Sequence, residues 1–395
     1  MRVCIGIDVA KEIHWATAVN EDGRVLLDRR VENTAEDIQA LIDGLRALGG
    51  ERVVGLDLLG GLAAFLSALL IAAGERLVHV PGLTVNRARQ GRPGGQAKSD
   101  PRDARVIADQ LRLHDHFRPI EPADQTVAEL RLLVSRRDDL VVDQTRRITR
   151  LRNLLLTIHP GLERALDVGA KGSLWLLTRY AAAGDIRKAG RKRLLRHLGR
   201  TAHIHDPEAL ADKALAAANA QPADLQLPGE RMTAELIAEL AAEALATRTR
   251  IRDIDRRLAD LLTRHPDGAL IQSLPGMGVV LAAEFLAQAG PMGRFASPDA
   301  LASAAGLAPV LRQSGKSSHL RRTTYADKNL KRVFYQSAFC SLGAPESRAF
   351  YDRKRREGKR HHQALIALAR RRINVLWAMM RDRQPYRAQN QPSAA

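Results

Sequence analysis

The sequence has few aromatic residues, few cysteines and a shortage of acidic relative to basic residues. Aromatic side chains make up 4% of the 395 residues, which argues against a protein that binds nucleic acid mainly by serial base stacking. The two cysteines, Cys4 and Cys340, lie far apart and lack metal-ligand spacing, which argues against a disulfide framework and a zinc site. We therefore expect a protein of the reducing cytoplasm.

Membrane-targeting features are also scarce. Residues 1–12 lack the basic start, apolar stretch and cleavage site of a signal peptide. The uncharged run from Leu58 to Gly74 has 17 residues, fewer than the roughly 20 that a membrane-spanning helix needs. The run is therefore predicted to be a buried helix of a soluble protein, and no membrane partner is expected.

Positive charge is in clear surplus. The chain has 62 Lys and Arg against 44 Asp and Glu, a formal net charge of +18. This balance predicts a partner of opposite charge, most commonly a polyphosphate such as nucleic acid. With 45% apolar residues the chain is able to bury a sizeable core, so global disorder is excluded, and its length predicts two or three domains.

Residues 1–120 alternate between strand and helix signals. Their order, βββαβαβα, predicts an α/β domain of the ribonuclease H-like (RuvC-like) class. The expected strands are 3–7, 15–19, 24–27, 52–57 and 76–80, and the expected helices are 35–48, 61–73 and one from Pro101 that follows a Gly/Arg-rich loop.

The rest of the chain follows a helical period. Within residues 121–265, apolar seams at 127–158 and 237–261 predict two long helices of a coiled coil, and pairing within the chain and between protomers both remain open. Residues 160–229 between them are expected to form a basic helical insertion. The last part, 266–385, is expected to be mostly α with a loop-rich centre, followed by a frayed tail at 386–395.

Four aspartates are expected to share a metal site. Asp8 and Asp57 end two neighbouring strands, and Asp100 and Asp103 lie three residues apart on one face of a helix start. Four hard oxygen donors suit two Mg²⁺ ions, which activate a nucleophile and stabilise the leaving oxygen in phosphodiester chemistry. A simpler interpretation makes Asp100 a helix N-cap and Asp8 a turn residue. The metal site is favoured because two strand-end aspartates and a helix-start pair occur along the chain in the order that a ribonuclease H-like fold requires.

These motifs resemble a known family, the bacterial insertion-sequence transposases with a DEDD, RuvC-like domain that are described as bridge-RNA-guided recombinases. The N-terminal resemblance rests on Gly6–Lys11, on the strand-end acid 49 residues after Asp8, and on Lys98–Ala104. The family's second domain is resembled, in order and spacing, by Leu274–Gly278, Arg294-Phe295, Ala305–Pro309 and Arg312–Gly315. Two positions depart from the family: Asp57 stands where Glu is usual, and Ala326–Asn329 lacks the glycine of a Lys-x-Gly-Asn turn.

The resemblance implies a DNA transposase or recombinase that acts on element ends and target DNA. It implies that Ser314 attacks a DNA phosphate and stays covalently attached, and that a noncoding guide RNA selects the sites. It also implies a homo-oligomer, dimer or tetramer, in which the aspartates of one protomer meet Ser314 of another. The expected location is the bacterial cytoplasm, in association with the nucleoid. The residues alone do not separate Ser314 from Ser317, Ser318 or Tyr325.

Several residues are predicted to contact nucleic acid. Gly276 and Gly278 lie in a turn that resembles a helix-hairpin-helix, where a backbone N–H approaches phosphate; a helix C-cap glycine is the alternative. The basic residues expected to contact phosphate are Arg312, Lys316, Arg321 and Arg322 around Ser314, and Arg191 and Lys192 in the insertion. The alternative for each is an ordinary solvated surface. The histidines show no ligand pattern.

Two competing functions remain open from the sequence. One is a RuvC-type, metal-dependent, structure-specific nuclease in which water attacks the phosphate and Ser314 plays no chemical part. The other is a degenerate copy, weakened at Asp57, that binds nucleic acid without catalysis.

Overall fold

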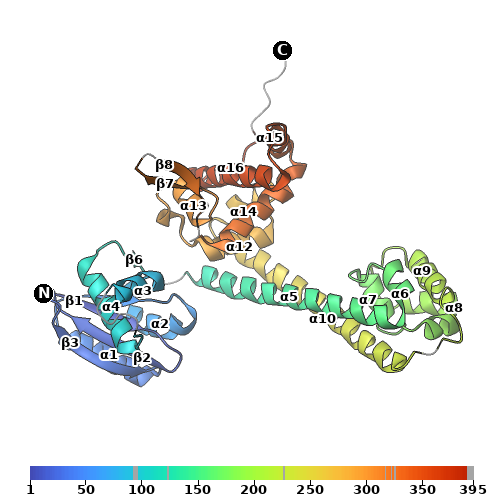
Figure 1. Cartoon of the computed structure of the whole chain (residues 1–395), viewed down its shortest axis with the longest axis horizontal. Helices are drawn as coiled ribbons and strands as arrows, with labels where there is room; N and C mark the ends of the chain where they lie inside the picture. The colour runs from blue at the N-terminus through green and yellow to red at the C-terminus, as the bar shows by residue number, and fades with distance from the viewer. Residues whose placement is uncertain are drawn as a thin grey trace, which may run out of the picture. The chain divides into compact units, whose positions relative to one another are not determined.

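The computed structural model describes residues 1–91, 97–121, 124–225, 227–315, 317–321, 323 and 326–388. The chain forms two compact units, Met1–Asp124 and Gln125–Ala395, which are described separately (Figure 1). Three residues named above, Lys316, Arg322 and Tyr325, lie outside the described residues, as does the predicted frayed tail from residue 389 onward.

The first unit contains a six-stranded sheet with the order β3-β2-β1-β4-β5-β6. β2 pairs antiparallel with β1 and β3, β4 pairs parallel with β1 and β5, and the short β6 pairs antiparallel with β5. The strands are β1 (Arg2–Asp8), β2 (Ile13–Val19), β3 (Val25–Glu32), β4 (Glu51–Leu56), β5 (Arg76–His79) and β6 (Arg118–Pro119). This is the ribonuclease H-like arrangement that the sequence predicts, with β6 as an unpredicted addition.

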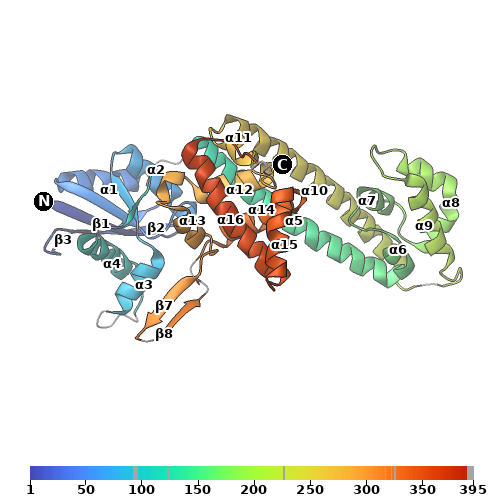
Figure 2. The ribbon, with the colours of Figure 1, turned by 90° about the horizontal axis from the view of Figure 1, so that it is seen from above.

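Helices cover both faces of this sheet (Figure 2). They are α1 (Ala35–Ala47), η1 (Gly61–Ala63), α2 (Ala64–Ala72), α3 (Gly82–Gln90) and α4 (Asp100–Leu113). Val3, Ile5 and Ile7 of β1 pack with α1 and α2, whereas Cys4, between them, packs with α4, as the two-residue period of a strand requires. The run from Leu58 to Gly74 forms η1 and α2 and is buried on one side only, because Leu66 and Leu70 are buried whereas Leu62 and Phe65 are 49% and 47% exposed. The helix α3 lies in a segment that was predicted to be loop.

Two glycines allow α4 to lie directly against the sheet. Gly6 of β1 pairs with Gly55 of β4. A Cβ atom on Gly6 would lie 2.1 Å from the Ala104 carbonyl oxygen and 2.4 Å from the Ala108 nitrogen. A Cβ on Gly55 would lie 2.9 Å from Cγ2 of Ile107. The absence of both side chains therefore sets the distance between α4 and the strands that carry Asp8 and Asp57.

The second unit is built on two long helices, α5 (Gln125–Ile158) and α10 (Glu230–Arg264). They pair within the chain and run antiparallel, because Arg137 contacts Asp255 at 2.6 Å while Arg147, further along α5, contacts Glu243 at 2.8 Å, further back along α10. Most of the predicted seam is buried, but Val141 is 38% exposed. The structure thus selects one of the two pairings that the sequence left open.

At one end of this pair, residues 160–229 form a helical insertion, whose apolar core also contains Leu151 and Leu155 of α5 and Ile237 of α10. Its helices are α6 (Pro160–Ala165), α7 (Lys171–Leu177), α8 (Ala183–Leu198) and α9 (Pro207–Asn219). The helix α8 is interrupted at Gly190, whose φ of 63° is a left-handed value that glycine adopts without strain.

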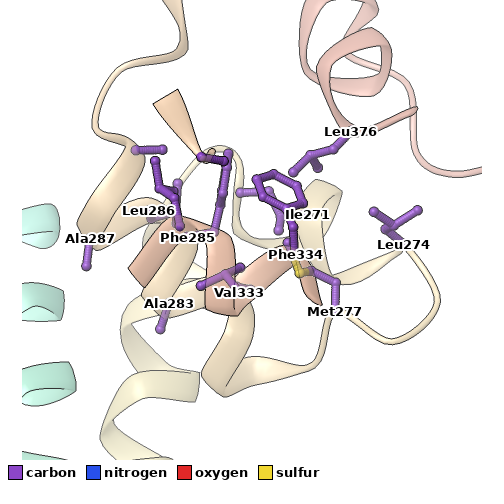
Figure 3. Packing of buried hydrophobic residues seen from close by; sticks show 14 of the residues in the cluster. Ile271, Leu274, Met277, Ala283, Phe285, Leu286, Ala287, Val333, Phe334 and Leu376 are labelled. Carbon is purple, nitrogen blue, oxygen red and sulfur yellow. The ribbon is translucent and has the colours of Figure 1, made fainter. Parts of the chain in front are cut away.

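The C-terminal elements pack around the other end of α5 and α10. The helices are α11 (Gly268–Gln272), α12 (Val279–Ala289), η2 (Met292–Arg294), α13 (Pro298–Ala304), α14 (Lys328–Cys340), η3 (Ser341–Gly343), α15 (Pro345–Arg356) and α16 (His361–Asp382). The rings of Phe285 and Phe334 pack edge to face in the core, with their centroids 5.7 Å apart (Figure 3). The centre of this part contains a hairpin of β7 (Val310–Ser314) and β8 (Ser317–Arg321) where loop was expected.

Across the described ranges, the helices are too short or too polar for any of them to cross a bilayer.

The close approach of α4 predicts that Gly6→Ala lowers the thermal stability of the first unit. The added methyl would collide with backbone atoms of α4, and overpacking of this kind costs about 1–3 kcal/mol. Gly44→Ala in α1 is the matched control, because its Cβ would lie at an ordinary 3.5 Å from Cδ1 of Leu27. The control should be neutral or stabilising by about 0.5–1 kcal/mol. Thermal unfolding of both variants tests this, and equal melting temperatures would contradict it.

Candidate active site

Asp8 and Asp57 are brought together by strand register. Ile7 of β1 lies opposite Leu56 of β4 in a parallel pair, so the next residue on each strand is an aspartate at the same edge of the sheet. Both side chains are partly buried. The structure therefore places these two carboxylates as the strand order predicts.

The other two aspartates lie at the start of α4 and differ in burial. Asp103 is 6% exposed, whereas Asp100 is exposed. The capping interpretation of Asp100 is wrong in position, because Ser99 occupies the N-cap and Asp100 is the first helical residue. Of the pair, Asp103 is the one that belongs to the buried edge. We call Asp8, Asp57, Asp100 and Asp103 the acidic cluster.

The members of the acidic cluster repel one another. Burial, reinforced by the charges of Asp57 and Asp103, raises the pKa of Asp8 to about 7, and Lys98 opposes the rise. Burial also raises the pKa of Asp57, although a hydrogen bond from the backbone N–H of Val9 opposes it. Carboxylates gathered in this way are stabilised by a cation.

The cluster fits a divalent cation by its chemistry. Oδ1 of Asp57 and Oδ1 of Asp103 are buried without hydrogen-bond partners, and carboxylate oxygens are the ligands that Mg²⁺ prefers. Within the described part of the chain, no three His, Cys, Asp or Glu side chains are close enough to form a ready-made metal site. The donors are thus gathered at one edge but not closed around an ion.

Two neighbours of the cluster were missed by the sequence analysis. Arg89, near the end of α3, has its Nε 3.2 Å from Oδ1 of Asp103. His79 ends β5, and its Nε2 lies 3.3 Å from the carbonyl oxygen of Asp57. His79 was detectable in principle, because β5 is the next parallel strand. Arg89 gave no signal, because its segment was taken as loop.

Ser314 lies at the tip of the β7–β8 hairpin, which we call the serine hairpin. Gly315 follows with φ of 54°, and every residue of both strands is exposed. Ser314 pairs with Ser317, and the next pair on the same face is Arg312 with His319. Arg321 is on this face too, since it pairs with Val310.

The register separates one rival nucleophile from the others. Ser318 pairs with Gln313, so it lies on the opposite face of the serine hairpin, with Leu311 and Leu320. Ser317 shares the face of Ser314 and remains a rival.

The two predicted glycines have different surroundings. Gly276 has φ of 79°, and a Cβ there would lie 2.6 Å from the Ser337 carbonyl oxygen, so this residue permits close packing against α14. It is not a C-cap, because α11 ends at Gln272. Gly278 is the exposed N-cap of α12 and has open space around it. The phosphate contact predicted for both glycines therefore has more room at Gly278 than at Gly276.

The two basic residues named in the insertion also differ. Arg191 is held by Asp212 at 2.7 Å and by Glu208 at 3.0 Å, both on α9. Lys192 is exposed and forms no ion pair with any described residue. The charge of Arg191 is therefore partly neutralised by Glu208 and Asp212, whereas that of Lys192 is not neutralised by an ion pair within the described ranges.

Comparison with known proteins identifies two transposase domains, one in each half of the chain. A family model for DEDD transposases of IS110-type elements, described as "Transposase", matches residues 5–160. A second, described as "Transposase IS116/IS110/IS902 family", matches residues 268–352. The first match contains the acidic cluster and the second contains the serine hairpin.

Several relatives match nearly the full chain, and they include the following three. The uncharacterized 42 kDa protein of insertion element IS900 from Mycobacterium paratuberculosis is 44% identical over 100% of this chain and 99% of its own length. The uncharacterized 44.8 kDa protein of IS116 from Streptomyces clavuligerus is 42% identical over 97% and 96%. The mini-circle putative transposase for IS117 from Streptomyces coelicolor is 28% identical over 98% and 95%. With two family models in order and full-length relatives at 42% and 44% identity, the chain belongs to the IS116/IS110/IS902 family of insertion-element transposases.

Proposed function

We propose that this transposase moves its element by metal-dependent phosphoryl transfer on DNA, through a covalent bond between Ser314 and a DNA phosphate. The observation that carries the proposal is the gathering of Asp8, Asp57 and Asp103 at one edge of the sheet, with two buried carboxylate oxygens that accept no hydrogen bond from any described residue. Such an arrangement is costly to a protein unless a cation uses it.

The acidic cluster would hold the divalent cation. Mg²⁺, in our proposal two ions, supplies positive charge that activates the attacking oxygen and stabilises the leaving one. The chain's part is positional: strand register sets Asp8 beside Asp57, and Gly6 lets α4 carry Asp103 to them. Asp57 is one methylene shorter than the Glu usual in the family, and its free Oδ1 supports its use as a ligand here.

Ser314 would form the covalent link. Its Oγ bonds to the phosphorus of a DNA phosphodiester while the strand oxygen leaves as a hydroxyl, taking the proton that Oγ gives up. Attack by the hydroxyl of another strand reverses the step and frees the serine. Arg312 and Arg321 share the face of Ser314, which supports their role in stabilising charge on the phosphate.

The remaining contacts are to nucleic acid and to other copies of the chain. We propose that a noncoding guide RNA selects the sites by base pairing, with the protein contacting RNA shape and backbone through residues such as Lys192 and Gly278. Arg191, Lys316 and Arg322 remain proposed contacts, as does Gly276 through its backbone. The protein would act as a homo-oligomer in the bacterial cytoplasm, because strands at two sites have to be cut and exchanged.

Ionised Asp8 is expected to lower the stability of the metal-free protein and to be required for DNA cleavage. Its raised pKa, about 7 against an ordinary 3.8, means that the folded protein holds the proton more tightly than the unfolded chain. Its contribution to stability is therefore greatest at low pH and is lost as the pH rises from about 4 to 7. Asp8→Asn should raise the melting temperature of the metal-free protein more at pH 8 than at pH 4, and should abolish DNA cleavage.

Thermal unfolding in EDTA and a nicking assay measure the two effects of Asp8→Asn. Asp43→Asn is the control, because this exposed carboxylate on α1 has surface contacts only: a hydrogen bond from Nε2 of Gln39 at 3.0 Å and an ion pair with Arg46 at 3.8 Å. The control should leave both the pH dependence and cleavage unchanged. Equal stabilisation at both pH values, or retained cleavage by Asp8→Asn, would count against the assigned role.

The decisive prediction concerns Ser314. A DNA substrate nicked so that the cut end diffuses away should trap a protein–DNA adduct that survives denaturation, because the second transfer has lost its strand. Ser314→Ala should remove the adduct. Ser318→Ala should keep it, because that serine is on the opposite face of the serine hairpin.

Peptide mapping of the adduct distinguishes the alternatives to Ser314. A phosphate on Ser317 or Tyr325 would refute Ser314 but keep the covalent mechanism. Nicked DNA without any adduct would indicate the water-attack nuclease. Nucleic-acid binding without Mg²⁺-dependent cleavage would indicate a degenerate copy.

Nucleic-acid binding should weaken steeply with salt, because each neutralised phosphate releases counterions. Lys192→Gln should reduce the slope of log K against log salt by about 0.9 on duplex DNA if it contacts one phosphate. Arg191→Gln should reduce it less, since Glu208 and Asp212 already occupy that guanidinium. Filter binding on DNA and on RNA gives both slopes, and an unchanged slope for Lys192→Gln would remove this residue from the interface.

A further inference from the structure

The acidic cluster has a cation of its own. The Nε of Arg89 lies 3.2 Å from Oδ1 of Asp103. The Arg89 side chain is 14% exposed and that of Asp103 8%, so the pair is largely withdrawn from water. Arg89 thus places a positive charge in direct contact with the most buried carboxylate of the cluster.

The contact is one of charge without a well-directed hydrogen bond. Nε of Arg89 and Oδ1 of Asp103 are both buried atoms that lack a hydrogen-bond partner. The guanidinium is oriented from its own helix instead, where Nη2 donates to Oδ1 of Asn86 at 3.1 Å. A buried ion pair without good hydrogen bonds recovers little of the cost of desolvation. Asp103 is therefore able to exchange Arg89 for a stronger cation.

One guanidinium does not balance the cluster. The charges of Asp57, Asp103 and Asp100 act on Asp8, and the cation that opposes them is the exposed Lys98. A divalent cation brings twice the charge of Arg89 and binds oxygens directly. Arg89 and the divalent cation would then compete for the same Oδ1 of Asp103.

We propose that Arg89 is a tethered counter-ion, which holds Asp103 while the cluster lacks metal and releases it when a divalent cation enters. The inference rests on the metal site of the proposed function. It makes Arg89 a positioning residue that weakens metal binding by competition. After release, its guanidinium remains on α3 beside the cluster, where a DNA phosphate is a suitable partner. Metal entry and phosphate binding would thereby be coupled through one side chain.

Arg89→Gln in the full-length protein tests the competition without measuring activity. In EDTA the variant should melt lower than wild type, because Asp103 loses its counter-ion. The increase in melting temperature caused by Mg²⁺ should exceed that of wild type, and Mn²⁺ measured by calorimetry should bind about tenfold more tightly, near 1.4 kcal/mol. Arg89→Lys, which keeps the charge, should bind Mn²⁺ within about threefold of wild type, under 0.7 kcal/mol.

The control is Arg105→Gln, which removes another ion pair of α4. Arg105 contacts the buried Asp109 at 3.0 Å. Its loss should lower the melting temperature without changing the Mg²⁺-induced increase. Weaker or unchanged Mn²⁺ binding by Arg89→Gln would overturn the inference and make Arg89 a structural link between α3 and α4.

A second measurement covers the case in which Arg89→Gln does not fold. In the wild-type protein, phenylglyoxal should modify Arg89 faster when Mg²⁺ is present, because release exposes the guanidinium, while Arg105 should react at the same rate. An Mg²⁺-independent rate at Arg89 would overturn the inference. If Asp8→Asn binds Mn²⁺ as well as wild type, the metal site of the proposed function fails as well. If only the Arg89 results fail, that site stands.

Discussion

The direct contact between α4 and the backbone of the sheet is the constraint on which the acidic cluster depends. Glycine normally weakens a strand, yet Gly6 and Gly55 face each other on β1 and β4 where α4 crosses them. A side chain at either position would move α4 away and carry Asp103 with it. The local cost of two glycines in central strands is therefore the condition for bringing a helix carboxylate to two strand carboxylates.

This packing gathers like charges in a partly buried place, which a structure selected for stability alone would avoid. Burial and mutual repulsion raise the pKa of Asp8, and two carboxylate oxygens remain without hydrogen bonds. Arg89 offsets only part of this charge. Such a site lowers the stability of the fold, and in the proposed function this loss is offset by affinity toward a cation, which is the usual relation between stability and function in enzymes.

The sequence predicts the parts of the fold that depend on local pattern. Alternation in β1 and the acids at strand ends located Asp8 and Asp57, because parallel strands end at one edge. The pairing of α5 and α10 within the chain was not predictable, because an apolar seam looks the same for a partner in the same chain or in another. Arg89 was not predictable either, since its contact with Asp103 exists only after α3 and α4 have packed. The serine hairpin has no buried face, so its strands lack the polar and apolar alternation that identifies a strand.

The two chemical groups of the proposed mechanism are held in opposite ways. The carboxylates are fixed by strand register and by a packed helix, whereas Ser314 sits on two strands whose residues are all exposed. An isolated two-stranded hairpin is only marginally stable in water, so its own hydrogen bonds do little to fix the direction of the serine. One face of the serine hairpin carries Ser314 with Arg312 and Arg321, and the other carries Leu311 and Leu320, which are 57% and 67% exposed. In the proposed mechanism, orientation of Ser314 would therefore come from the molecules that bind these two faces, which would confine covalent chemistry to the assembled nucleic-acid complex.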